Sequence, residues 1–318
     1  MNVKPVLGTM NFGPQVSDSE SFQMVDCFLK EGYEDIDTAY VYNNGDSEKF
    51  LGNALKKISP LSSVVATKAN PRVTGRLDSD SIRYQLKKSL KRLQVESVDI
   101  LYLHFPDPST PLHETLKACS DMRKDGYFNK LGLSNYSAWE VSHIWHLCKQ
   151  NGWPVPCVYQ GLYNGLSRNI ESELIPALRE FDISFYAYNP LAGGILSGKY
   201  TNFKDNLEGR FSHRPNYKER YWKKEFFDAL DVLNKACQNS NLSLVEASYR
   251  WLIQHSSLSG NAGDKIIIGA SSLKQFKQNM KFFEKETLTK EVLEAFELAW
   301  NISKNESPSY FRTVNQSF

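Results

Sequence analysis

The regular alternation of short apolar runs with longer amphipathic stretches most constrains how this chain can fold. Several of the short runs are almost continuously apolar, as expected of parallel strands that are buried on both faces. We predict eight strands, over Val3–Leu7, Tyr33–Asp37, Val64–Thr67, Val98–Leu103, Lys130–Leu133, Cys157–Tyr159, Ile183–Tyr186 and Lys265–Ile268.

The stretches between these runs have helical periodicity. Within Ser79–Leu93, for example, Ile82 and Leu86 fall on the same face of a helix. Ser17 followed by Glu20 predicts a capping box at the start of the first helix. We predict helices over Asp18–Lys30, Ser79–Leu93, Pro111–Arg123, Ala138–Lys149, Glu171–Phe181, Glu225–Gln238, Leu244–His255 and Leu273–Phe283.

Strands that alternate with such helices form βαβ units around a parallel sheet. Eight units in 318 residues predict an α/β fold, a (β/α)8 TIM barrel, for which ~250 residues is typical. We expect residues 1–318 to form a single barrel domain, with the surplus in a long substrate loop, Tyr200–Lys224, between strands 7 and 8 and in a C-terminal tail after Ser303. A doubly wound sheet is the competing fold, but the chain has neither G-x-G-x-x-G nor a Walker A motif.

Composition bears on partners and location. Lys and Arg total 38 and Asp and Glu total 36, a net charge of +2, so we expect no nucleic-acid partner. The longest charge-free run, Gln150–Ser167, contains two prolines, so we expect no membrane span. The five cysteines form no CxxC pair and the N-terminus has no signal-like apolar stretch, so we expect a cytoplasmic protein. His143 and His146 lack a third ligand, so we predict no metal site.

Ionisable side chains end three consecutive strands. Asp37 ends the second strand, Lys68 follows the third and His104 follows the fourth, while Tyr42 lies five residues after Asp37. Because barrel active sites lie at the carboxyl ends of the strands, we expect these four side chains to meet at one rim. A buried lysine is costly unless it is paired, and Asp37 is the candidate partner.

These residue types suit the protonation of a carbonyl oxygen. A phenol with its ordinary pKa of ~10 is a weak acid, and we expect the Lys68 cation to lower the pKa of Tyr42. Asp37 would hold Lys68 in place, and His104 would donate a hydrogen bond to the substrate oxygen as it becomes anionic. Hydride must then come from a cofactor, because none of these side chains supplies it.

Longer motifs with characteristic spacing extend this pattern. They are Leu7–Met10, Asp37–Tyr42, Ala66–Pro71, Tyr102–His104, Leu131–Tyr136, Val158–Gly161, Tyr186–Gly194 and Ile268–Ser272. From about residue 5 to residue 312 the chain resembles the aldo-keto reductase superfamily. It is most similar to the branch of aflatoxin-aldehyde and succinic-semialdehyde reductases.

This resemblance implies a role for each matching position. Tyr42 matches the proton donor, Asp37 and Lys68 the pair that tunes its pKa, and His104 the residue that orients the carbonyl. The implied cofactor is NADP(H). The implied cofactor-binding residues are Asp37, Ser134, Asn135, Gln160, Tyr188, Asn189, Leu191, Gly193, Gly194, Lys199, Arg210, Ser271, Ser272, Gln275 and Asn279.

The implied substrate-binding residues are Tyr42, His104, Tyr217 and Arg220, of which the arginine suits a carboxylate. Many relatives carry an arginine where this chain has Gln275, which weakens the implied preference for NADP(H) over NAD. Lys199, Arg210 and Lys274 are cations that could compensate.

The resemblance therefore implies NADPH-dependent reduction of aldehydes and dicarbonyls to alcohols, a detoxification activity, and it suggests a homodimer. One alternative is a regulatory cofactor-binding module like a potassium-channel β subunit, against which the complete set of four catalytic side chains argues. Another is a pyridoxal or sugar reductase of a neighbouring branch, which only substrate profiling separates.

Overall fold

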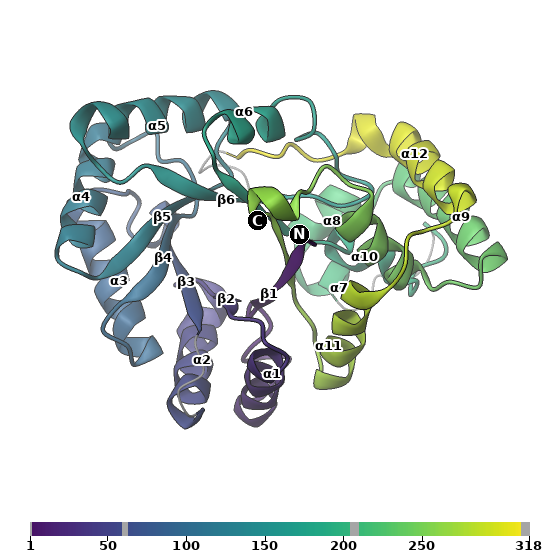
Figure 1. Ribbon diagram of the computed structural model, residues 1–318, viewed down its shortest axis with the longest axis horizontal. Helices are drawn as coiled ribbons and strands as arrows, with labels where there is room; N and C mark the ends of the chain where they lie inside the picture. The colour runs from purple at the N-terminus through teal and green to yellow at the C-terminus, as the bar shows by residue number, and fades with distance from the viewer. Residues whose placement is uncertain (1, 59–62, 204–209, 313–318) are drawn as a thin grey trace.

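The computed structural model describes residues 2–58, 63–203 and 210–312. Its parallel strands pair in chain order, and β8 pairs with β1, so that the sheet closes into a barrel (Figure 1). The strands are β1 (Lys4–Gly8), β2 (Asp35–Asp37), β3 (Val64–Ala69), β4 (Val98–Leu103), β5 (Phe128–Ser134), β6 (Pro156–Leu162), β7 (Ser184–Tyr188) and β8 (Lys265–Ile268). The predicted (β/α)8 TIM barrel is confirmed, and the strands begin and end within a few residues of the predicted runs.

Helices surround the barrel (Figure 1). They are α1 (Asp18–Lys30), α2 (Asp46–Lys57), α3 (Ser79–Leu93), α4 (Leu112–Lys124), α5 (Ala138–Asn151), α6 (Leu174–Glu180), α7 (Arg210–His213), α8 (Pro215–Tyr221), α9 (Lys224–Asn239), α10 (Leu244–Gln254), α11 (Leu273–Met280) and α12 (Lys290–Ser303). The sequence pattern does not predict α2 or α12, and the long loop Tyr200–Lys224 contains the short helices α7 and α8. Among the described residues, no helix is both long and apolar enough to cross a membrane.

The capping box predicted for α1 is only half formed. The Ser17 hydroxyl accepts a hydrogen bond from the backbone N–H of Glu20 at 3.3 Å, as predicted. The Glu20 carboxylate does not turn back to Ser17, because it accepts the backbone N–H of Leu273 at 2.6 Å. Glu20 thus joins the first helix of the barrel to the start of α11.

The inside of the barrel is filled below its carboxyl rim. Tyr102 on β4 is fully buried there, and its ring centroid lies 5.4 Å from the Nζ atom of Lys68 on β3. Gly132 on the next strand leaves room for this ring, since a Cβ atom at that position would lie 2.4 Å from Tyr102 Cδ1. The packed interior therefore forms a floor beneath Lys68 and directs its ammonium group toward the rim.

Candidate active site

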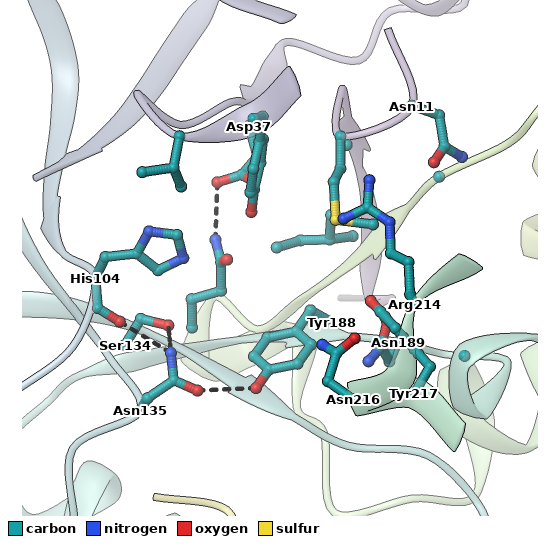
Figure 2. A pocket seen from close by; sticks show the side chains of 18 of the residues that line it. Asn11, Asp37, His104, Ser134, Asn135, Tyr188, Asn189, Arg214, Asn216 and Tyr217 are labelled. Carbon is teal, nitrogen blue, oxygen red and sulfur yellow. Dashed lines mark hydrogen bonds between the residues drawn. The ribbon is translucent and has the colours of Figure 1, made fainter. Parts of the chain in front are cut away.

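A cavity of about 810 Å³ lies at the carboxyl rim of the barrel (Figure 2). Its walls come from the ends of the strands and from α8, which crosses the rim. Ligand pockets of small-molecule enzymes commonly have ~300–1,000 Å³, so the cavity is large enough for a cofactor headgroup together with a small substrate.

Lys68 and Asp37 form a buried ion pair at the bottom of this cavity. The Lys68 Nζ atom lies 2.6 Å from Asp37 Oδ1 and 2.7 Å from Oδ2, and it also donates to the backbone carbonyl of Thr38 at 2.7 Å. Both side chains are almost fully buried. Burial lowers the pKa of Lys68, while the adjacent carboxylate opposes that change and favours the charged form.

Tyr42 lies beside this pair on the turn that follows β2. The Lys68 Nζ atom is 5.1 Å from the centroid of the Tyr42 ring, and the Tyr42 and His104 rings lie edge to face with centroids 6.1 Å apart. The predicted lowering of the Tyr42 pKa is wrong for this structure. Burial raises that pKa well above its ordinary value, and the Asp37 carboxylate raises it further. Lys68, whose Nζ atom lies 5.1 Å from the ring centroid, does not reverse this upward shift of the Tyr42 pKa.

His104 follows β4 and faces the cavity (Figure 2). The side-chain amide of Asn70 lies 3.2 Å from its Nδ1 atom. With the Asn70 Nδ2 group as the donor, Nδ1 is the acceptor and the imidazole proton is on Nε2. Burial lowers the pKa of His104 well below its ordinary value, and the positive charges of Lys68 and Arg72 lower it further. The imidazole is therefore neutral near pH 7 and has one N–H to donate.

Four polar residues predicted to bind the nicotinamide line the cavity, and Figure 2 shows Ser134, Asn135 and Tyr188 close together. Asn135 donates to the Ser134 hydroxyl at 3.0 Å and to the His104 carbonyl at 2.9 Å. The Tyr188 hydroxyl donates to Asn135 Oδ1 at 2.9 Å, and Gln160 donates to Asp37 Oδ1 at 2.8 Å. This network holds polar groups at the cavity surface in fixed orientations.

The loop after β7 continues this wall with Asn189, Leu191 and two glycines, all of which were predicted. Gly193 and Gly194 have φ angles of 69° and 115°, which favour glycine. At Gly193 the approach is also close, since a Cβ atom would lie 2.6 Å from the Tyr217 ring. Asn189 Nδ2 is buried without a hydrogen-bond partner among the described residues, so the wall holds an unused donor.

Other predicted cofactor residues lie outside the cavity wall. In and after β8, Gly269 is the last residue of that segment that lines the cavity. Ser271 and Ser272 instead hydrogen-bond to Gln275 in the first turn of α11. Asn279 is buried further along that helix and Lys199 is exposed, while the Arg210 side chain and the tail 313–318 lie outside the described residues.

The predicted substrate residues Tyr217 and Arg220 line the cavity from α8. The Arg220 Cζ atom lies 5.3 Å from the centroid of the Tyr217 ring, and its Nη2 atom is buried without a hydrogen-bond partner among the described residues.

The sequence analysis missed three further arginines that line the cavity, Arg72, Arg214 and Arg312. Arg72 directly follows the Ala66–Pro71 motif, and that position was the available signal.

Comparison with known proteins agrees with this geometry. The model of the aldo/keto reductase family matches residues 6–301. The chain is 47% identical to aflatoxin B1 aldehyde reductase member 2 of Rattus norvegicus over 319 residues, which covers 96% of this chain and 87% of the relative. It is 45% identical to aldo-keto reductase family 7 member A3 of Homo sapiens over 319 residues, which covers 96% of both chains.

Proposed function

This chain belongs to the aldo/keto reductase family, and on that premise we propose that its cavity binds NADPH with a small aldehyde and yields the alcohol. One observation supports this proposal most strongly. The Lys68–Asp37 ion pair lies beside Tyr42, and the Tyr42 ring is next to a neutral His104. Two similar proteins are named as aflatoxin B1 aldehyde reductases. We propose reactive aldehydes and dicarbonyls as the substrate class of this chain.

The residues present fit a nicotinamide cofactor. Asn189 Nδ2 has no acceptor among the described residues, and the glycine turn beside it presents backbone to the cavity. Ser134, Asn135, Gln160 and Tyr188 would hold the carboxamide and the ring, as the resemblance implies. When bound, a reduced nicotinamide supplies hydride to the carbonyl carbon.

The side chains act on the carbonyl oxygen. The His104 Nε2–H group donates a hydrogen bond to that oxygen and becomes a stronger partner as negative charge develops there. The Tyr42 hydroxyl then donates its proton, since an alkoxide is more basic than a phenolate. The raised pKa of Tyr42 keeps the phenol protonated until the substrate oxygen becomes basic. Lys68 stabilises the phenolate that remains, and Asp37 holds Lys68 in position.

Arg220 favours aldehydes that carry a carboxylate, such as succinic semialdehyde. Its Nη2 atom is a buried donor without an acceptor among the described residues, and a substrate carboxylate would supply one. The detoxification role and the homodimer are further parts of this proposal, and they rest on the family resemblance. The cytoplasmic location is also part of it, and it rests on the scattered cysteines and the N-terminal sequence.

The test is NADPH oxidation with a panel of aldehydes, for the wild-type protein and for Tyr42→Phe. We expect the variant to lose at least about 100-fold in kcat, because general acid catalysis contributes ~10²–10⁴-fold. It should still bind NADPH, which cofactor fluorescence measures. Unchanged turnover would contradict the role of Tyr42. Cofactor binding without turnover of any carbonyl by the wild type would favour the regulatory module instead.

A further inference from the structure

Positive charge is concentrated around the cavity. Four arginines line it, and among the described lining residues Asp37 is the only acidic one. Asp37 is already paired with Lys68, so its charge is not available to the arginines. The proposed carboxylate contact uses only Arg220, whereas Arg72, Arg214 and Arg312 also line the cavity.

Arg72 lies on the side of the cavity where the carbonyl is expected to bind. It belongs to the turn Pro71–Val73 after β3. Its Cζ atom lies 5.0 Å from the centroid of the Phe105 ring, and Phe105 directly follows His104. The positive charge of Arg72 helps to lower the pKa of His104, and both side chains line the cavity.

Arg72 and Arg220 line the same cavity although they come from different elements. Burial lowers the pKa of Arg72, and the positive charge of Arg220 lowers it further. Each guanidinium lies over an aromatic ring, Arg72 over Phe105 and Arg220 over Tyr217, and this stacking fixes its orientation. Two cations in one cavity repel each other, and an anion bound between them would remove that repulsion.

Arg214 lies elsewhere in the cavity. Figure 2 shows it near Asn11, on the opposite side from His104. Arg72 therefore lies on the side of the cavity that carries His104, Arg220 enters the cavity from α8, and Arg214 faces the side where β1 and β8 meet.

We propose that Arg72 and Arg220 form a subsite for a doubly charged oxyanion, so that the preferred aldehydes carry a phosphate monoester or two carboxylates. Guanidinium groups bind such oxyanions through paired N–H donors, and two of them match two negative charges. This inference rests on the proposed aldehyde reduction and specifies its substrate class.

The first experiment compares matched aromatic aldehydes that differ in charge. Benzaldehyde is neutral, 4-carboxybenzaldehyde carries one charge, and 4-formylphenyl phosphate and 5-formylisophthalate each carry two. We expect kcat/KM for at least one dianion to exceed that for the monoanion by about 10- to 100-fold, since one further charged hydrogen-bond pair contributes roughly that factor. The better dianion identifies whether phosphate or two carboxylates fit the subsite.

The second experiment uses Arg72→Met, Arg220→Met and, as a matched control, Arg83→Met on the outer surface of α3. Arg72→Met should abolish the advantage of the dianion over the monoanion, and Arg220→Met should also weaken the advantage of the monoanion over benzaldehyde. The control should keep both ratios. Calorimetry with phenyl phosphate and benzoate gives a readout independent of turnover, in which Arg72→Met should weaken phenyl phosphate binding more than benzoate binding.

Equal kcat/KM values for the monoanion and both dianions in the wild type would overturn the subsite and leave the proposed aldehyde reduction intact. An unchanged dianion preference in Arg72→Met would overturn the role of Arg72. If the wild type reduces no aldehyde in the series, the proposed function fails and this inference fails with it. Arg72→Lys keeps the charge without the paired donors, and it should restore part of the dianion preference if Arg72→Met folds poorly.

Discussion

His104 is buried, its pKa is lowered by the charges of a lysine and an arginine, and its ring accepts a hydrogen bond from Asn70. All of these surroundings favour the neutral imidazole over the charged one. A neutral ring can donate from Nε2 without adding a full positive charge to a cavity that already has four arginines in its wall. The protonation state of this residue is thus set by burial and by the cations around it.

We predict that this histidine makes stability depend on pH. Its native pKa is depressed, so below an unfolded pKa of ~6.5 the unfolded chain takes up a proton that the native protein does not. The free energy of unfolding therefore falls as the pH drops below ~6.5, by up to ~1.4 kcal/mol per pH unit for one group. Urea unfolding should be measured near neutral pH and at one pH unit below ~6.5. Between these two conditions the free energy of unfolding of the wild type should fall by about 1 kcal/mol more than that of His104→Gln. Equal losses would mean that His104 titrates normally.

The positions of the four candidate catalytic residues could be predicted because each lies near or after the carboxyl end of a strand, and strand ends meet at one rim. The direction of the Tyr42 pKa shift could not, because it depends on how deeply the ring is buried and on the pairing of Lys68 with Asp37. Arg72 was missed for a similar reason. Its side chain enters the cavity because of a 3-10 turn whose geometry no sequence pattern specified.

The turn that carries Tyr42 is held against the barrel by two helices. Arg92 on α3 donates to the Tyr40 carbonyl at 3.1 Å and to the Glu48 carboxylate on α2 at 3.0 Å. Glu48 is fully buried and accepts a further hydrogen bond from Thr67 on β3 at 2.7 Å. Gly45 ends the turn with a φ of 92°, and a Cβ atom there would lie 2.3 Å from Arg92 Cζ.

We predict that Gly45→Ala displaces Arg92 and moves Tyr42 away from His104. The variant should lose about 10- to 100-fold in kcat, since a misplacement of ~1 Å can cost that much. Its free energy of unfolding should also be ~1–3 kcal/mol lower than that of the wild type, because alanine strains the backbone at this φ angle.

Gly32→Ala is the matched control for Gly45→Ala. Gly32 has a φ of 81° and no atom within 4 Å of an added Cβ, so it tests the strain alone. Both variants should lose stability, but only Gly45→Ala should lose kcat with the aldehydes of the Tyr42→Phe test. If kcat falls equally in both, the contacts of Arg92 with Tyr40 and Glu48 do not position Tyr42.

The eight strands could be predicted because a buried parallel strand is apolar along its whole length. Helix α2 could not be predicted from its sequence pattern, because Gly52 interrupts the helical periodicity of its apolar residues. A Cβ atom at Gly52 would lie 2.6 Å from the Leu93 carbonyl, so a residue that weakens the helical pattern is the one that lets α2 approach the end of α3. Helix α8 is short, and tertiary contacts such as Tyr217 against Gly193 fix its place.

Across the whole molecule, charge is nearly balanced while the cavity is strongly positive. The net charge of +2 over 318 residues gives no indication of this, because the closed barrel gathers residues from distant segments at one rim. Arg72 and Arg220 are far apart in the chain, and only closure of the sheet brings them to the same cavity. A single domain over residues 1–318 stays a prediction.

Cofactor binding should stabilise the whole barrel. A ligand that binds only the native state adds about 4 kcal/mol at 1,000 times its Kd. NADPH would contact wall residues in and just after β5, β6 and β7. We expect NADPH to raise the Tm by several degrees, and by more than NADH at the same concentration. The difference should be modest, because the resemblance implies an arginine in many relatives where this chain has Gln275. Lys199, Arg210 and Lys274 are the cations expected to compensate, and the exposed Lys274 is the one chosen for substitution. Lys274→Met should reduce the rise in Tm with NADPH and leave the rise in Tm with NADH unaltered. Equal rises in Tm with the two cofactors in the wild type would contradict the preference for NADPH.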